Sequence, residues 1–185
     1  MKFLDLFEEI VKGDSGLTEE TIYKSIQLGN DLLPLWGGNQ SHQVAEVFVD
    51  EKAKTKKEKP ITVFQGEGII ISLDGSAGNM TYKPKRSRFA LNHHAGFFKA
   101  KDDTKIDLEF FSIFYQHQFI SMTVSEGSKT LSLRQIYQME FDIPSKPEQT
   151  QLMTKLKPLL EKAHKAREFI SRVENLMNKS IIQPK

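Results

Sequence analysis

The sequence predicts an α+β domain followed by a long helix. Short apolar runs separated by glycine, asparagine and aspartate turns fill residues 32–98 and predict a mixed or antiparallel twisted sheet. Short stretches with helical spacing flank this region on both sides. A glycine-free segment with regularly spaced apolar residues follows and predicts one long helix. We therefore expect a domain over residues 1–146, a helix over 147–180 and a tail over 181–185.

Two short helices are predicted before the sheet. The apolar residues from Phe3 to Val11 have helical spacing, and the pattern stops at Gly13. Thr18 is the predicted N-cap of a second short helix that runs through Tyr23. The sheet is expected to begin only after these helices.

Two more helices are predicted after the sheet. Asp107 is the predicted N-cap of a helix that continues to Phe119 and presents a bulky aromatic face to the core. Ser132 and Gln135 have the spacing of a capping box, which predicts the start of a further short helix. The domain is expected to end near Pro144.

The C-terminal segment predicts a projecting coiled-coil helix. Its apolar residues recur at alternating steps of four and three, a mean period of 3.5 that indicates a left-handed seam with a partner helix. The helix would be about 50 Å long, too long to be buried on one domain. Pro158 predicts a kink or a break into two helices. The predicted seam residues are Leu152, Leu156, Leu159, Ala163, Ala166, Ile170, Val173 and Met177.

Composition excludes several classes of protein. The chain has 185 residues and no cysteine, which excludes a disulfide scaffold, a thiol nucleophile and a zinc site built from cysteines. No apolar run is long enough to cross a bilayer, and the acidic amphipathic start does not have the pattern of a signal peptide. We therefore expect a soluble cytoplasmic protein that does not contact a membrane.

The formal net charge of +2 conceals a polarised distribution. Residues 1–51 carry 3 lysines and 10 acids, whereas residues 52–101 carry 11 basic and 3 acidic residues. Residues 102–150 are acidic again, and residues 151–185 are basic. A central basic segment is expected where one face meets a polyanion, although surface lysines equally serve solubility alone.

No catalytic, metal or cofactor site is predicted. His93 and His94 are adjacent, and in a strand they would point to opposite faces, so they would not chelate one ion together with Asp74. The turn from Gly75 to Gly78 lacks the lysine of a phosphate-binding loop. A small nuclease that uses His93 and Asp74 stays open as a minor alternative.

Polar and basic loop residues predict nucleic-acid binding. Asparagine and glutamine can bond an adenine edge, and lysine clusters can lie along a phosphate backbone. An exposed, solvated loop is the alternative for each cluster. The candidates for base contact are Asn39, Gln40, Ser41, His42, Ser76 and Asn79. The candidates for phosphate contact are Lys54, Lys56, Lys57, Lys83, Lys85, Arg86, Arg88 and Lys129.

Several segments, taken in order, carry a resemblance to a known family. They are FEEIVKG at 7–13, LWGGN at 35–39, GIIIS at 68–72 leading to DGSAG at 74–78, Asn92 before an apolar strand, the segment 125–133, and Ile143-Pro144 followed by Pro147-Glu148-Gln149. In this order the chain resembles one target recognition domain and one conserved helix of the specificity subunits of type I restriction-modification systems. The resemblance covers nearly the whole chain.

The resemblance implies a non-catalytic subunit that reads double-stranded DNA. Family members usually hold two recognition domains separated by two long helices, so one of each implies a half-sized subunit that forms a homodimer. The implied partners are methyltransferase subunits, which bind S-adenosylmethionine and methylate adenine, and a restriction endonuclease subunit. A recognition module of a larger restriction-modification enzyme and a protein interaction module with a coiled-coil helix are the alternatives.

Overall fold

The computed structural model describes residues 1–18, 20–22, 31–38, 47–123 and 129–181. It divides the chain into two units, Met1–Ile143 and Pro144–Lys185. The helices of the first unit are α1 (Phe3–Leu6), α3 (Leu108–Phe114), α4 (Gln116–Ser121) and α5 (Leu133–Gln138). Its strands are β1 (Val11–Lys12), β2 (Leu32–Trp36), β3 (Val47–Asp50), β4 (Val63–Gln65), β5 (Gly68–Ser72), β6 (Met80–Lys83), β7 (Arg88–Leu91) and β8 (Ala95–Phe98).

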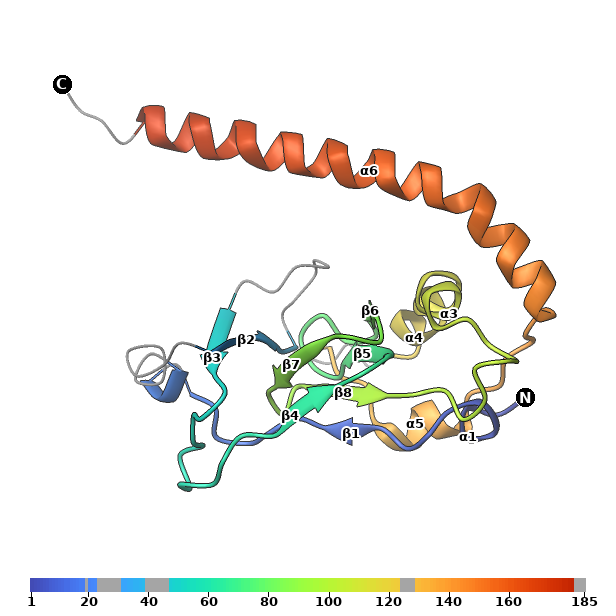
Figure 1. Ribbon diagram of the computed structural model, residues 1–185, viewed down its shortest axis with the longest axis horizontal. Coiled ribbons are helices and arrows are strands. Elements are labelled where there is room, and N and C mark those ends of the chain that lie inside the picture. The colour runs from blue at the N-terminus through green and yellow to red at the C-terminus, as the bar shows by residue number, and fades with distance from the viewer. Residues whose placement is uncertain (19, 23–30, 39–46, 124–128, 182–185) are drawn as a thin grey trace. The chain divides into compact units, whose positions relative to one another are not determined.

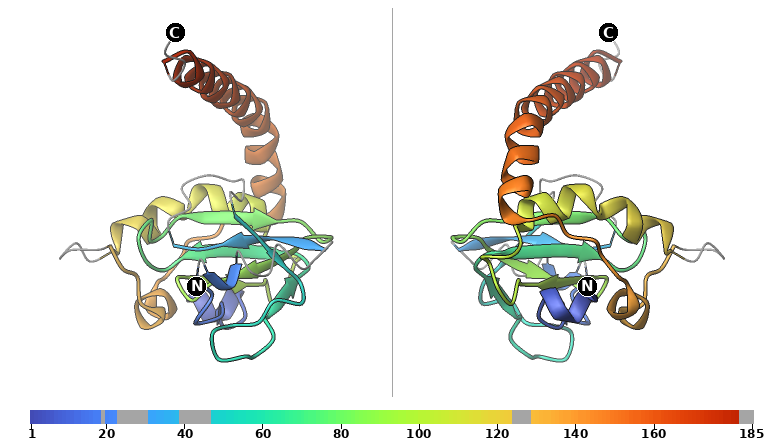
Figure 2. Two further views of the ribbon diagram at one scale, coloured as in Figure 1. Left: turned by 90° about the vertical axis from the view of Figure 1, so that its left-hand side faces the viewer. Right: turned by 90° about the vertical axis from the view of Figure 1, so that its right-hand side faces the viewer.

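The described strands form two four-stranded sheets rather than one. The first has the order β1-β8-β5-β6, and the second has the order β3-β2-β7-β4. All neighbours pair antiparallel except β2 and β7, which run parallel with Trp36 opposite Leu91. The predicted α+β class and the mixed sheet are thus confirmed. Figures 1 and 2 show α3 and α4 lying along one side of β5 and β6.

The two sheets share an aromatic and aliphatic core. Trp36, Phe89 and Leu91 of the second sheet are buried in one cluster with Ile70 and Phe97 of the first. A second cluster of buried apolar side chains lies on the opposite face of the second sheet. Its members are Leu33, Leu35, Val49, Ala53, Ile61 and Ala90.

The strand pairing brings several turns of the chain together at one end of the strands. Because β2 and β7 are parallel, their carboxyl ends lie next to each other at this end. Ser72 at the end of β5 pairs with Ala95 at the start of β8, and β7 leads into β8 through a short turn. The turn that joins β6 to β7 lies at the opposite ends of both strands.

The predicted first helix is wrong beyond Leu6. Phe7 already has extended backbone angles, and the Glu8 N–H donates to the carbonyl of Lys99 at 2.9 Å. Val11 then pairs with Phe97 in the first sheet. Strand pairing with β8 therefore overrides the helical spacing beyond Leu6, and it leaves Val11 exposed. The Thr18 hydroxyl does cap a helical turn over residues 20–22, and Tyr23 lies outside the described residues.

The aromatic helix predicted after the sheet begins where expected but does not continue unbroken to Phe119. The Asp107 carboxylate accepts from the N–H of Phe110 at 2.9 Å, which confirms the predicted N-cap. The helix is interrupted at Tyr115, between α3 and α4, and the Tyr115 hydroxyl donates to the carbonyl of Asp142. Phe111 and Phe119 are buried as predicted, whereas Phe114 is exposed.

The predicted capping box of α5 is confirmed. The Ser132 side chain accepts from the N–H of Gln135 at 3.2 Å, and the Gln135 amide oxygen accepts from the N–H of Ser132 at 3.0 Å. These reciprocal bonds satisfy two of the N–H groups that a helix start leaves free.

The second unit is one helix, α6 (Lys146–Ile181), of 36 residues. The Glu148 carboxylate accepts from the N–H and hydroxyl of Ser145 and caps its start. The helix continues through Pro158, and Figure 1 shows it curving along its first half. Of the two alternatives expected at Pro158, a kink or a break into two helices, the break is therefore wrong. The predicted seam residues Leu159 and Ile170 are 60% and 54% exposed. The coiled coil stays a prediction. Among the described helices, none has an apolar stretch that would span a bilayer.

Candidate nucleic-acid interface

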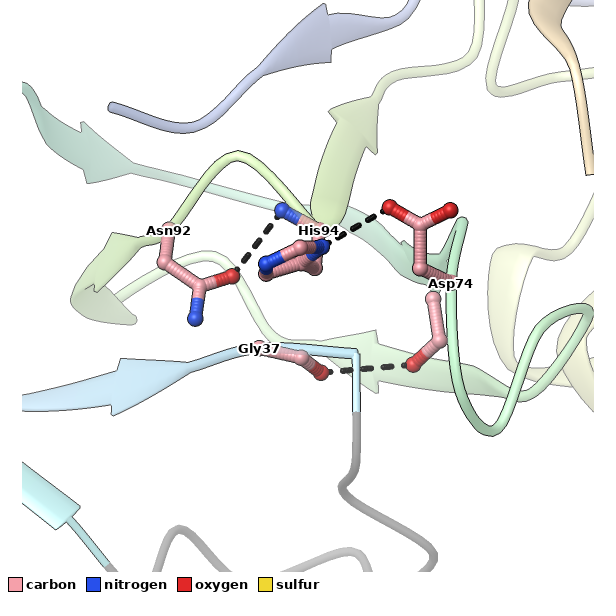
Figure 3. A network of polar contacts seen from close by, with 5 residues as sticks. Gly37, Asp74, Asn92 and His94 are labelled. Atoms are coloured by element: carbon pink, nitrogen blue, oxygen red, sulfur yellow. Dashed lines mark hydrogen bonds and ion pairs between the residues drawn. The ribbon is translucent and has the colours of Figure 1, made fainter. Parts of the chain in front are cut away.

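The edge where the strand ends meet gathers polar residues from five separate parts of the chain. We call it the polar edge. It comprises Asp14 after β1, Gly37 and Gly38 after β2, Asp74–Asn79 after β5, Asn92–His94 between β7 and β8, and Lys129 before α5. Figure 3 shows its centre, where Gly37, Asp74, Asn92 and His94 lie side by side.

Glycines allow the turns of the polar edge to touch. The N–H of Ser76 donates to the carbonyl of Gly38 at 2.7 Å, and the N–H of Asn92 donates to the carbonyl of Trp36 at 3.0 Å. A Cβ atom on Gly38 would lie 2.3 Å from the carbonyl oxygen of Asp74, closer than packed atoms approach. Gly37 is similarly covered by the Asn92 side chain. Gly38 is therefore required for the close approach of two backbone segments, and Gly37 leaves room for the Asn92 side chain.

A small hydrogen-bond network fixes His94. Its ring Nδ1 lies 2.8 Å from Oδ2 of Asp74, and its backbone N–H donates to the Asn92 side chain at 3.0 Å (Figure 3). Because an ionised carboxylate only accepts, Nδ1 carries the proton in this pair and Nε2 is left for other partners. The side chain of His94 is 43% exposed, so the network is open to solvent.

His93 lies against His94 rather than on an opposite face. The two residues occupy a turn, not a strand, and their ring centroids are 3.8 Å apart. The expectation that adjacent histidines diverge was therefore based on the wrong local structure. Desolvation and the neighbouring charge of His94 lower the pKa of His93. Within the part of the chain that the structure describes, no three histidine or acidic side chains are arranged to hold a metal ion.

The structure brings three of the predicted DNA-binding residues to the polar edge. The turn that follows β5 carries Ser76 and Asn79, both partly exposed, and the N–H of Gly75 donates to the carbonyl of Lys129 at 3.0 Å. The remaining candidates for base contact, Asn39, Gln40, Ser41 and His42, follow Gly38 in the sequence and lie outside the described residues.

The second basic cluster comprises Lys83, Lys85, Arg86 and Arg88, and it lies away from the polar edge, at the opposite ends of β6 and β7. Lys85 forms an ion pair with Glu67 at 3.9 Å, and Arg88 forms one with Glu51 at 2.7 Å. Arg86 is exposed in the turn between them. Ion pairs at such exposed sites are weak, so these cations stay accessible to phosphate.

Lys83 differs from the rest of its cluster. Its ammonium group lies 3.5 Å from the centre of the Trp36 ring, a cation–π contact. Burial lowers the pKa of Lys83 to about 8. Phosphate binding by Lys83 stays a prediction, and it would require the side chain to leave Trp36.

The first basic cluster comprises Lys54, Lys56 and Lys57, and it occupies a separate loop between β3 and β4. The loop folds back on itself, because Ile61 donates to the carbonyl of Ala53 at 3.1 Å. Lys54 pairs with Glu58 at 3.5 Å, and Lys56 and Lys57 are exposed. The three lysines therefore form an accessible cationic surface, whose DNA contact stays a prediction.

Sequence reasoning missed the roles of Asn92 and His94. Both follow the buried end of β7, as Asp74 follows the buried end of β5 and Gly37 follows Trp36. Polar or glycine residues directly after apolar strands were the available signal. That these turns meet depends on the parallel pairing of β2 with β7, which residue spacing does not encode.

The fold is shared with solved structures from type I restriction-modification systems. The S subunit from M. genitalium superposes with a TM-score of 0.64 at 14% identity, over 97% of this chain and 43% of that one. A structure from work on complex assembly and conformational transition of the type I R-M system gives 0.64 at 12% identity, over 97% of this chain and 42% of that one. The HsdS subunit from Thermoanaerobacter tengcongensis gives 0.58 at 10%, over 91% and 38%.

The chain spans less than half the length of each of these structures. No curated protein matches the sequence. Residues 17–174 match the family described as "Type I restriction modification DNA specificity domain", a segment that includes the strands β2 to β8 and most of α6. Because this match extends over most of the sequence, the chain belongs to the family of type I restriction-modification DNA specificity domains.

Proposed function

We propose that this chain recognises a specific duplex DNA sequence for a type I restriction-modification complex. The observation that carries the proposal is the family match over residues 17–174, which spans most of the two-sheet domain and most of the long helix. The solvent-open polar edge supports it, since hydrogen-bonding groups on turns held by a rigid scaffold are suited to reading base edges.

Base recognition is assigned to the polar edge and phosphate binding to the basic clusters. Ser76 and Asn79 offer a hydroxyl and an amide on the turn after β5. Strands of four or five residues are about 13–17 Å long, close to the width of a major groove of about 12 Å. One duplex can therefore contact groups at both ends of the strands.

The helix α6 is assigned to assembly. Two copies that pair through their helices would present two recognition domains related by twofold symmetry, which suits a palindromic target. The chain then carries no catalytic group and binds no cofactor. Methyltransferase subunits that bind S-adenosylmethionine and an endonuclease subunit would supply the chemistry.

Selection from a random duplex pool tests the proposal. The full chain is incubated with duplexes of about 30 bp, long enough for two half-sites, and bound molecules are sequenced. We expect enrichment of one motif, with binding that weakens steeply as salt rises. Replacing Ser76 and Asn79 by alanine should reduce the enrichment more than the total binding, because base contacts specify and phosphate contacts position.

The contrary outcome is equally clear. Binding that is independent of salt, or a bound pool identical to the input pool, would contradict sequence-specific DNA recognition. Co-purification of the chain with a methyltransferase subunit, followed by mapping of methylated adenines, tests the proposed assembly separately.

A further inference from the structure

We propose that His94 contacts the DNA through its Nε2 atom and takes up a proton as the DNA binds, with Asp74 as the residue that positions it. The inference rests on the proposed function, because it assigns a role within the same recognition surface. The partner group is a hydrogen-bond acceptor on the duplex, either a phosphate oxygen or the N7 and O6 atoms of guanine.

The geometry of the network supports a contact role. The ring is held on one side by Asp74 at 2.8 Å, and its backbone is held by Asn92 at 3.0 Å. Nε2, across the ring from Nδ1, is then the nitrogen available to an incoming partner. The side chain is 43% exposed, so a partner from solvent can reach the ring. The ring is thus fixed in direction without being covered.

The charges around His94 make its protonation matter for a polyanion. The neutral imidazole beside the Asp74 carboxylate leaves a net negative pair facing the solvent. Protonation neutralises this pair and changes Nε2 from an acceptor into a donor. An approaching phosphate or guanine edge favours the donor form, so bound DNA and the bound proton stabilise each other.

The other charged groups of the polar edge do not replace His94. Asp14, after β1, is acidic, and its two carboxylate oxygens accept from the N–H and hydroxyl of Thr62. His93 in the same turn has a lowered pKa and stays neutral more readily. Lys12 at the end of β1 and Lys129 before α5 are exposed cations. Among the described residues of the polar edge, His94 is therefore the group to which we assign the proton taken up with the DNA.

The test is the pH dependence of DNA affinity for the full chain. The random duplex pool serves as the probe, and anisotropy is measured at constant ionic strength from about pH 8 to about pH 6, where imidazoles titrate. For one linked proton we expect the affinity to rise as the pH falls, with a slope approaching tenfold per pH unit. His94→Gln keeps a hydrogen-bonding side chain that does not titrate, and it should flatten this profile.

Two further variants separate contact from structure. His93→Gln is the matched control beside His94 and should keep the wild-type slope. Asp74→Asn should keep a slope but move the profile to lower pH, because the imidazolium loses an adjacent negative charge. Circular dichroism over the same pH range verifies that each variant stays folded. A purely structural role for Asp74 would change the affinity without moving the profile.

The nature of the DNA contact is resolved by salt and by base composition. Loss of a phosphate contact in His94→Gln reduces the slope of log affinity against log salt by about 0.9. Loss of a guanine contact leaves that slope unchanged and reduces the difference in affinity between a mixed pool and an A·T-only pool. Either result supports the inference.

The failure of the inference differs from that of the proposed function. If the wild type binds DNA with no pH dependence, or if His94→Gln keeps the wild-type profile in both salt and pH, the role of His94 is wrong while DNA recognition stands. If no duplex binds at any pH, both proposals are wrong.

Discussion

The closest packing of the polar edge depends on Gly38. Replacing it with alanine would place a Cβ atom 2.3 Å from the carbonyl oxygen of Asp74, and backbone atoms cannot give way as a flexible side chain can. We expect Gly38→Ala to lower the free energy of unfolding by about 1–3 kcal/mol, the usual range for overpacking. Urea unfolding measures this. Ser76→Ala in the adjacent turn is the control and should unfold like the wild type; equal stability of both variants would contradict the packing.

The buried amine of Lys83 makes stability depend on pH. The pKa of Lys83 is lowered to about 8 by burial, whereas an unfolded lysine titrates near about 10.4. Between these values the unfolded chain binds more protons, so the free energy of unfolding should rise with pH from about 8 to about 9.5. Below about pH 8 both states are charged, and the burial cost is fully present.

Replacing Lys83 tests this dependence. Lys83→Met keeps a long side chain over Trp36 without a titrating group, and it should remove the rise seen in urea unfolding at alkaline pH. Lys85→Met, which removes an exposed lysine of the same turn, should leave the rise in place. An identical rise in all three proteins would show that another group is responsible.

At the scale of elements, the sequence was sufficient to predict structure wherever the deciding hydrogen bonds join residues close together in the chain. The Ser132–Gln135 box and the Asp107 cap involve partners three residues apart, so spacing alone predicted them. The turns after Trp36 and Ser72 were predicted from their glycines for the same reason. The helix predicted at the start of the chain was wrong beyond Leu6, because the apolar spacing there suits a helix. The partner that decides the structure of this segment is β8, which is far away in the sequence.

The element α6 carries a prediction about assembly. Leu159 and Ile170 are exposed apolar residues of the predicted seam. If two copies pair there, replacing both by glutamate places like charges within the seam and should convert a dimer into monomers, as measured by light scattering. Changing Glu161 to lysine and Lys165 to glutamate, outside the seam, is the control. A monomeric wild type would contradict pairing through α6.

At the scale of the whole molecule, the two basic clusters lie on different structural elements and can be tested against each other. Replacing Lys85, Arg86 and Arg88 by alanine, or Lys54, Lys56 and Lys57 by alanine, removes three cations in each case. Replacing the cluster that contacts phosphate should reduce the slope of log affinity against log salt by about 2–3. The other triple variant is then the control. Unchanged slopes in both would exclude both clusters from the DNA interface.

The gathering of the polar edge could not be predicted from the sequence. Its turns were recognised one at a time, and Ser76, Asn79 and Lys129 were selected only by residue type. Their proximity to Gly38 and Asn92 results from parallel pairing between β2 and β7, whose residues are more than fifty positions apart. Chain topology decides such contacts, and periodicity does not report it. The same limit explains why the basic clusters were not expected at separate places.

The parallel pair has a further consequence for how the protein is made. Leu35 opposes Ala90, so β2 has no parallel partner until the chain has been synthesised past β7 and closed a long loop. Pairings of such high contact order form late in folding. A nascent chain can thus form its individual turns before the polar edge is assembled. If the polar edge binds DNA as proposed, a chain truncated before β8 should not bind a chosen DNA sequence.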